Sequence, residues 1–246
     1  MIDTKTFIYG KHALAEALTH ARRAVSEVFL AKQFDDQEFI TFLKKSGISV
    51  INKLPSGIDA TAVHQGVVAT VSFAHLIRDY EEFAEQLKVG SETSLVLLAE
   101  VQDPQNVGAV IRSAAAFGVS GVLIPEHNQA QITGAVAKVS AGMAFRVPLV
   151  SIGNINTTLR DLKDRGFAVY GLSGDAKYVV TKEEFALPTV FVLGNESEGM
   201  REKTKELCDK LLSIPMHPQC ESLNAATSAS IAFYAWSAKH PKALRI

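Results

Sequence analysis

The 246-residue sequence has little of what marks secreted or membrane proteins. Its two cysteines, Cys208 and Cys220, have neither metal-ligand spacing nor the density of a disulfide-stabilised scaffold, which favours a reducing compartment. No apolar run reaches membrane-spanning length, and the first residues lack the apolar segment of a signal peptide. These absences predict a soluble, cytoplasmic protein that does not act at a membrane.

An excess of charge of either sign is also missing. The chain carries 25 lysines and arginines against 26 aspartates and glutamates, for a net charge of −1. A division at residue 75 gives 8 basic against 7 acidic residues in the first part and 17 against 19 in the second. There is therefore no global electrostatic signature of nucleic-acid binding, and any RNA contact would depend on local patches.

Several familiar site motifs are absent. No G-x-G-x-x-G follows a predicted strand and no G-x-x-x-x-G-K-[ST] occurs, which excludes the common dinucleotide and P-loop sites. Ser197 has Asn195 where a hydrolase nucleophile elbow requires glycine. No group of His, Cys and carboxylate residues has metal-ligand spacing, so we expect no metal site.

What is present at the N-terminus is a short α/β pattern. Helical spacing at residues 12–19 and 36–46, with Gly47 as a stop, alternates with apolar runs at 25–31, 48–51 and 67–73. His64-Gln65-Gly66 precedes the last run, either as a turn or as a contact to RNA. We predict a small domain over residues 1–75, followed by a helical linker over 76–92 and a larger domain over 93–246.

The larger domain begins with a continuous apolar run at 95–99, typical of a strand buried on both faces. A turn at 103–106, a helix from 107 that ends at Gly118, and a strand at 121–124 complete a βαβ unit. Further strands are predicted at 146–150 and 167–172, with helices at 135–141 and 156–164. Asn106 is expected before the first helix as a cap or turn residue. Arg112 is expected within the helix among apolar neighbours. Its charge there is either buried, and then paired or functional, or carried out to solvent by the long side chain.

Two apolar runs, 189–193 and 211–214, end abruptly at Gly194 and Pro215. If these strands are neighbours, their ends form a ligand-binding floor of the kind found in open α/β sheets. Residues 201–210 between them are expected to form a short helix. An Ala- and Ser-rich helix follows at 225–237, with Ser222 or Asn224 as its N-cap, and it packs either inside one chain or in a dimer. Acidic, hydroxyl and amide side chains cluster around the two ends: Glu196, Glu198, Glu221, Ser222 and Asn224.

From the residues alone, these features indicate an α/β ligand-binding enzyme. Three blocks taken together are more specific. They are N-V-G-A-V-I-R-S-A-A-A-F-G at 106–118, F-V-L-G-N-E with E-G-M at 191–200, and I-P-M with E-S-L-N at 214–224. In this order they resemble the three motifs of the SpoU (TrmH) RNA ribose methyltransferases of the SPOUT superfamily. The front end, I-Y-G-K-H-A at 8–13 and H-Q-G at 64–66, is similar to the small RNA-binding domain in the ribosomal-RNA branch of that family.

The resemblance implies an α/β methyltransferase domain with a parallel sheet and a trefoil knot, preceded by the small α/β RNA-binding domain. It implies that S-adenosyl-L-methionine contacts Leu193, Gly194, Ile214, Met216 and Leu223. It also implies five catalytic positions: Asn106, Arg112, Glu196, Ser222 and Asn224. Because a guanidinium does not lose its proton in proteins, we expect Arg112 to bind a phosphate and the developing alkoxide, with phosphate or water taking the proton. Glu196 and Asn224 are expected to orient Arg112 and the ribose.

The function implied is methylation of a guanosine 2′-hydroxyl in 23S ribosomal RNA by a homodimer that associates through its C-terminal helix. Two alternatives stay open: a tRNA ribose methyltransferase, and a non-catalytic RNA-binding or assembly protein with the same fold. The sequence departs from the family pattern at Pro218, where glycine is common and where proline removes an N–H, and in the polar stretch A-A-T-S-A-S after Asn224.

Overall fold

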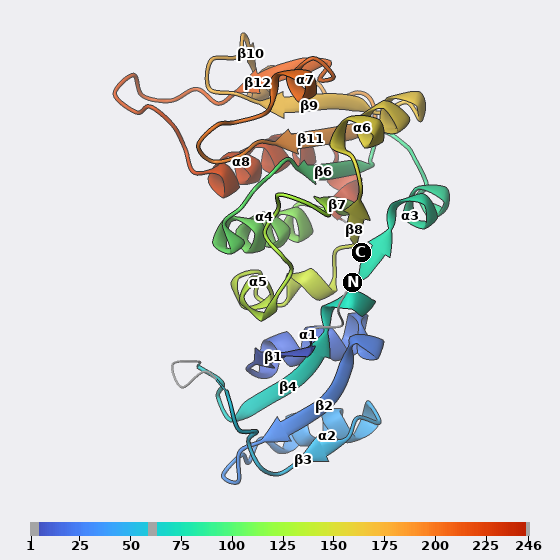
Figure 1. Ribbon diagram of the computed structural model, residues 1–246, viewed down its shortest axis with the longest axis vertical. Helices are drawn as coiled ribbons and strands as arrows, with labels where there is room; N and C mark the ends of the chain where they lie inside the picture. The colour runs from blue at the N-terminus through green and yellow to red at the C-terminus, as the bar shows by residue number, and fades with distance from the viewer. Residues whose placement is uncertain (1–4, 59–62, 245–246) are drawn as a thin grey trace. The chain divides into compact units, whose positions relative to one another are not determined.

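The computed structural model describes residues 5–58 and 63–244, which form two compact units (Figure 1). The first unit consists of Met1–Ile77 together with Ile132–Arg146, and the second consists of Arg78–Gln131 with Val147–Ile246. No sequence pattern predicts that residues 132–146 belong with the N-terminal unit. The domain limits drawn at 75 and 92 from the sequence stay predictions.

The first unit is a four-stranded sheet with helices. Strand β4 (Val67–Ser72) lies between β1 (Lys5–Tyr9) and β2 (Val25–Leu30) and is antiparallel to both, while β3 (Val50–Ile51) pairs in parallel with β2. The helices of the N-terminal stretch are α1 (Lys11–His20) and α2 (Gln37–Lys45). Asp36 begins α2 by accepting a hydrogen bond from the Phe39 N–H at 3.0 Å, and Gly47 follows its end at φ +65°.

The inserted segment 132–146 carries α5 (Gly134–Val139) and packs within this first unit. Phe145 stacks on Phe73 with ring centroids 6.1 Å apart, and Arg146 forms an ion pair with Glu16 at 2.7 Å. Gly134 approaches β1 so closely that a Cβ would lie 2.5 Å from the Phe7 carbonyl oxygen. The segment is therefore part of the core of the first unit.

The second unit is built on a sheet with the order β10-β12-β9-β11-β6-β7-β8-β5. Each pairing from β10 to β8 is parallel, as the sequence predicts. Its strands are β5 (Ile77–Asp79), β6 (Ser94–Leu98), β7 (Gly121–Pro125), β8 (Leu149–Ile152), β9 (Ala168–Leu172), β10 (Tyr178–Val179), β11 (Thr189–Leu193) and β12 (Lys210–Ser213). Its α-helices are α3 (Tyr80–Gln86), α4 (Pro104–Ala116), α6 (Ile155–Asp164), α7 (Glu202–Lys205) and α8 (Ala225–Ser237). The trefoil knot implied by the resemblance stays a prediction.

Both faces of this sheet are covered, which explains the continuous apolar runs of its central strands. On one face, Leu97 of β6 belongs to a cluster with Phe83 of α3 and Leu159 of α6. On the other face, Phe191 of β11 meets Phe233 of α8 with ring centroids 5.4 Å apart. The strand backbones are thereby fixed, and polar groups gather where the strands end.

Helix α4 ends near Gly118 as the sequence predicts, but it begins at Pro104, earlier than the predicted start at 107. Asp103 is the N-cap, accepting from the Gln105 N–H at 2.8 Å, and Pro104 occupies the first turn. Gly118 follows the helix at φ +73°, where a Cβ would lie 2.4 Å from the Ala243 carbonyl oxygen. Asn106 therefore lies inside the first turn of the helix, and the expectation that it precedes the helix is wrong.

Three other local expectations need correction. The stretch 76–92, expected to be a helical linker, is not one helix, because β5 occupies Ile77–Asp79 before α3 begins at Tyr80. The helix expected over 201–210 is only α7, since Lys210 already begins β12. The strand expected at 146–150 starts later, at Leu149. No helix within the described residues is long and apolar enough to cross a membrane.

Candidate functional site

A pocket of about 230 Å³ lies at the carboxyl ends of three strands of the second unit. The ends of β11 and β12 are expected from the sequence to be neighbours. This expectation is wrong, because β9 lies between the two strands. The residues after β9 therefore complete the floor of the pocket. The lining residues include all five predicted cofactor contacts: Leu193, Gly194, Ile214, Met216 and Leu223.

Sequence reasoning missed the contribution of β9. Leu172, Ser173 and Gly174 line the pocket between the β11 and β12 ends. The signal was present, because the apolar run of β9 stops at a Ser-Gly pair that is as abrupt as the stop at Gly194. Strand order could not be read from the sequence, so the third strand end had no reason to be grouped with the other two.

The loop after β11 is a tight turn that carries Glu196. The Asn195 and Gly199 main chains exchange two hydrogen bonds of 3.0 and 2.9 Å, and the Asn195 side-chain oxygen accepts from the N–H groups of Ser197 and Glu198. A Cβ on Gly194 would lie 2.4 Å from the Met200 main-chain nitrogen. Only glycine permits this close approach, so the chain folds back at once and presents Glu196 at the pocket.

A chain of hydrogen bonds joins three of the predicted catalytic residues. Asn106 donates through Nδ2 to Glu196 Oε1 at 2.8 Å, and its Oδ1 accepts from Asn224 Nδ2 at 2.8 Å. Asn224 in turn accepts from the N–H groups of Ala226 and Thr227, which makes it the N-cap of α8 as predicted. Asn106 is only 7% exposed, so its amide is held from both sides.

The electrostatics of Glu196 follow from this arrangement. Burial raises the pKa of its carboxyl group, but hydrogen bonds from Asn106 and from the main-chain N–H groups of Asp103 and Gln102 outweigh that effect and hold the pKa below its usual range. The site therefore keeps a carboxylate ionised at neutral pH beside the pocket.

Arg112 and Ser222 do not join this chain of contacts. Arg112 is exposed, which favours the alternative in which its side chain reaches solvent over the buried one, and it forms no hydrogen bond or ion pair with any residue that the structure describes. Glu196 and Asn224 both contact Asn106 in this structure. Their expected role in orienting Arg112 and the ribose stays a prediction. Ser222 is exposed and lines the pocket.

Neither cysteine nor any acidic cluster suggests other chemistry here. Cys208 and Cys220 are both free, and burial raises the pKa of the Cys208 thiol to about 12, which leaves it unreactive. Across residues 5–58 and 63–244, no group of three or more His, Cys, Asp or Glu side chains could hold a metal ion.

Comparisons with known proteins agree with these motifs. The model of the SpoU rRNA Methylase family matches residues 93–234, and a model described as RNA 2′-O ribose methyltransferase substrate binding matches residues 7–76. Curated proteins named 23S rRNA (guanosine-2′-O-)-methyltransferase RlmB are similar over nearly the whole chain. The one from Ralstonia nicotianae is 34% identical over 92% of this chain and 93% of its own length. The one from Haemophilus influenzae is 35% identical over 92% and 95%.

The fold also has solved counterparts. The SpoU methyltransferase AviRb from Streptomyces viridochromogenes, in complex with the cofactor AdoMet, superposes with a TM-score of 0.79 at 23% identity and covers 96% of this chain and 91% of its own. At that identity the likeness establishes the fold.

The Glu196 contacts predict a pH dependence of stability. A carboxyl whose pKa is lowered by folding stabilises the native state above its unfolded pKa of about 4.3, and that contribution is lost as the pH falls through the folded value. Acidification from neutral pH should therefore lower the free energy of unfolding more in the wild type than in Glu196→Gln. Urea unfolding followed by fluorescence of Trp236, the single tryptophan and a buried residue of α8, measures this difference.

Glu198→Gln is the matched control, because the Glu198 carboxylate accepts no hydrogen bond from the residues that the structure describes. It should keep the wild-type pH dependence. Identical acid profiles for wild type and Glu196→Gln would mean that the Asn106 contact does not form in solution.

Proposed function

This chain belongs to the SpoU rRNA Methylase family, and we propose that it transfers a methyl group from S-adenosyl-L-methionine to the 2′-hydroxyl of a guanosine in 23S ribosomal RNA. The observation that carries the proposal is the joining of Glu196, Asn106 and Asn224 at the edge of a pocket formed by three strand ends. These residues come from all three motifs, and the curated relatives that share the chain's length are named for this reaction.

The pocket is suited to the proposed cofactor. Its wall combines apolar side chains, among them Leu193, Leu212 and Met216, with two carboxylates, Glu196 and Glu221. Apolar contacts suit an adenine ring and methylene groups, and carboxylates suit a cationic sulfonium and an amino group. When bound there, S-adenosyl-L-methionine supplies an electrophilic methyl group. Pro218 lies in the exposed loop after β12, where its missing N–H removes one main-chain donor.

The residues of the chain itself would position the ribose. Asn106 and Asn224 are fixed amides next to Glu196, and Ser222 offers a hydroxyl at the pocket wall. Methyl transfer requires the 2′-oxygen in line with the methyl group, at about 3–3.5 Å. We assign these side chains to holding the hydroxyl in that geometry, with a phosphate oxygen or water accepting its proton.

Arg112 is assigned to binding an RNA phosphate and the developing alkoxide. It stays protonated, it is exposed, and it has no partner in the part of the chain that the structure describes, so its donors are available to RNA.

Arg112→Lys should reduce kcat by roughly 10- to 100-fold, because lysine keeps the charge and loses the planar pair of donors. Single-turnover methylation with saturating cofactor measures the effect. Arg160→Lys, an equally conservative change of an exposed arginine on α6, is the control and should retain wild-type activity. A near-wild-type rate for Arg112→Lys would contradict the bidentate role.

Label transfer tests the reaction and its substrate together. Tritium from labelled S-adenosyl-L-methionine should enter undermodified 23S rRNA at one 2′-O-methylguanosine, found in an alkali-resistant dinucleotide. The curated relatives that match nearly the whole chain are named for 23S rRNA, which favours this substrate over tRNA. Label found only in tRNA would identify the alternative enzyme. Cofactor binding without transfer to deproteinised rRNA would favour a ribosome-assembly substrate, and failure to bind the cofactor would favour the non-catalytic alternative.

We further propose a homodimer that associates through α8, acting in the cytoplasm, where its rRNA substrate is made. Tyr234 on α8 is 63% exposed, and its ring meets that of Phe117 edge-on with centroids 5.9 Å apart. An exposed aromatic side chain therefore lies on a helix whose other residues are mostly small Ala and Ser. Light scattering should give twice the chain mass of 26.6 kDa, and Tyr234→Glu should lower it toward one chain without unfolding. A one-chain mass for the wild type would contradict the dimer.

A further inference from the structure

Glu100, just beyond the end of β6, has a backbone conformation that most residues avoid. Its φ is +67°, in the left-handed region that favours glycine, and its N–H donates to the Leu98 carbonyl oxygen at 3.2 Å. Such strain costs free energy and persists only where the surroundings fix it. The conformation turns the chain from β6 toward the N-terminus of α4, where the Glu196 contacts lie.

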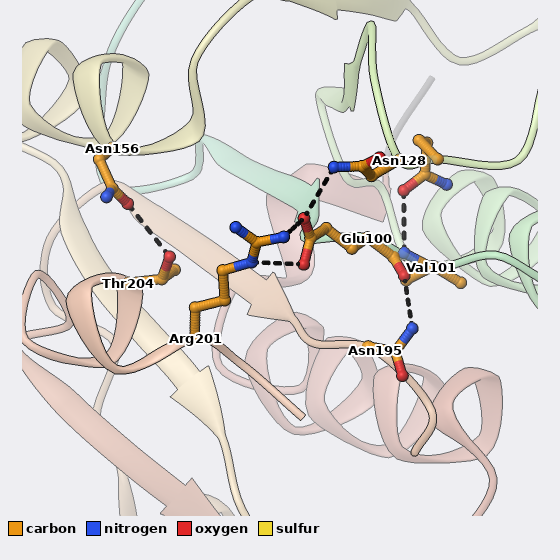
Figure 2. A network of polar contacts seen from close by, with 8 residues as sticks. Glu100, Val101, Asn128, Asn156, Asn195, Arg201 and Thr204 are labelled. Atoms are coloured by element: carbon orange, nitrogen blue, oxygen red, sulfur yellow. Dashed lines mark hydrogen bonds and ion pairs between the residues drawn. The ribbon is translucent and has the colours of Figure 1, made fainter. Parts of the chain in front are cut away.

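The side chain of Glu100 is held by two donors (Figure 2). Arg201 binds the carboxylate through two guanidinium nitrogens. Nη2 lies 2.6 Å from Oε1, and Nε donates to Oε2 at 2.8 Å. Asn128 adds a longer contact of 3.4 Å to Oε1. A bidentate pair fixes direction as well as distance, so Glu100 and Arg201 set each other's orientation.

The main chain of Glu100 is also engaged. Its carbonyl oxygen accepts from Asn195 Nδ2 at 3.0 Å, and the next N–H, on Val101, donates to Gln129 Oε1 at 2.9 Å. Figure 2 shows the Arg201 and Asn195 contacts meeting Glu100 from the side chain and from the main chain. One residue thus fastens both ends of the 195–201 loop.

Glu196 lies inside that fastened loop. Its carboxylate accepts from the main-chain N–H groups of Gln102 and Asp103, both at 3.4 Å, and these follow Glu100 by two and three positions. The same turn therefore holds the loop at Asn195 and Arg201 and also receives the carboxylate of Glu196. The two contacts are long, so a small shift of the loop would break them.

The main chain of Arg201 has its own anchor. It is the N-cap residue of α7, and Thr204 within α7 donates to Asn156 Oδ1 of α6 at 3.1 Å. The Arg201 side chain is 71% exposed, whereas that of Glu100 is 18% exposed. Exposed ion pairs contribute little to folding stability, so the pair has a larger consequence for the loop than for the fold.

We propose that Glu100 and Arg201 are positioning residues that hold Glu196 against Asn106 and the start of α4. The proposal rests on the methyltransferase function proposed above for its catalytic consequence, and on the contacts alone for its structural one. Neither residue lines the pocket, so their effect on the reaction passes through Glu196.

The kinetic test uses the full-length variants Arg201→Ala and Glu100→Gln, and the double variant. Each single change should lower kcat by roughly tenfold with the KM for RNA unchanged, and the double variant should be no slower than either single one because the two residues act as a unit. Arg165→Ala removes a comparable exposed ion pair, with Asp161, near the opposite end of β9, and should retain wild-type kcat.

The structural test measures the pKa of Glu196 by carbon NMR of labelled glutamate side chains and needs no activity. If Glu196 is no longer held against Asn106 and the start of α4, its pKa should rise toward the ordinary value in both single variants. Glu100→Gln is the decisive one, because removal of a nearby negative charge by itself would lower the pKa of Glu196. Glu100→Gly, which relieves the positive φ, replaces it if the glutamine variant does not fold.

The outcomes separate the possibilities. A raised Glu196 pKa together with slower turnover supports the proposal. Wild-type kcat in both single variants, or a lowered pKa in Glu100→Gln, overturns it. A higher KM for RNA in Arg201→Ala alone also overturns it, because Arg201 would then contact RNA directly. If the wild type itself transfers no methyl group, the proposed function fails, and the NMR result still decides whether the pair positions Glu196.

Discussion

The hydrogen-bond chain from Glu196 through Asn106 to Asn224 is the interaction on which the site depends. It joins the loop after β11, the first turn of α4 and the start of α8, which lie 90 and 118 residues apart along the chain. An ionised carboxylate only accepts hydrogen bonds, so the NH₂ of Asn106 must face Glu196 and its oxygen must face Asn224. The Asn224 oxygen is then left for the N–H groups of α8. One charge at one end thus fixes the direction of every amide in the chain.

The same chain sets the charge balance of the site. The start of α4 and the amide of Asn106 keep Glu196 ionised, and Glu221 places a second carboxylate at the pocket wall. A negatively charged pocket favours a cationic ligand but opposes a polyanion such as RNA. Arg112, exposed and without a partner among the described residues, supplies positive charge from the same helix that holds Asn106. Helix α4 thus contributes both to the negatively charged pocket, which suits the cationic cofactor, and to the positive charge that suits RNA. The protein as a whole does not need to be strongly basic.

Much of the second unit could be predicted from the sequence because its signals are local. Apolar runs and the Gly118 stop of α4 follow from short-range chemistry, whereas residues 103–106 were interpreted as a turn although Asp103 and Pro104 begin the helix. The order of the strands could not, since parallel pairing depends on contacts across the chain, and so the position of β9 between β11 and β12 was missed. Whether Arg112 is buried or exposed could not be decided from the sequence for a similar reason, because periodicity identifies a helix face and cannot say whether that face is covered.

The site residues were predicted by resemblance more than by physics. Spacing alone indicated strand ends with acidic and amide side chains, and the roles of Asn106 and Asn224 came from the motifs. The partnership between Glu100 and Arg201 left no local signal, since the two are separated by 101 positions and one adopts a backbone conformation that its residue type does not favour.

The membership of residues 132–146 in the first unit has a consequence for how the protein can be divided. A fragment that starts after residue 75 would keep α5 and Phe145 but lose the β1, α1 and Phe73 surfaces on which they pack. Its newly exposed apolar side chains would favour aggregation, which could be mistaken for an intrinsic instability of the parallel sheet. A fragment meant to contain the second unit alone should therefore lack residues 132–146 as well as the N-terminal stretch, with β7 joined to β8 by a short loop.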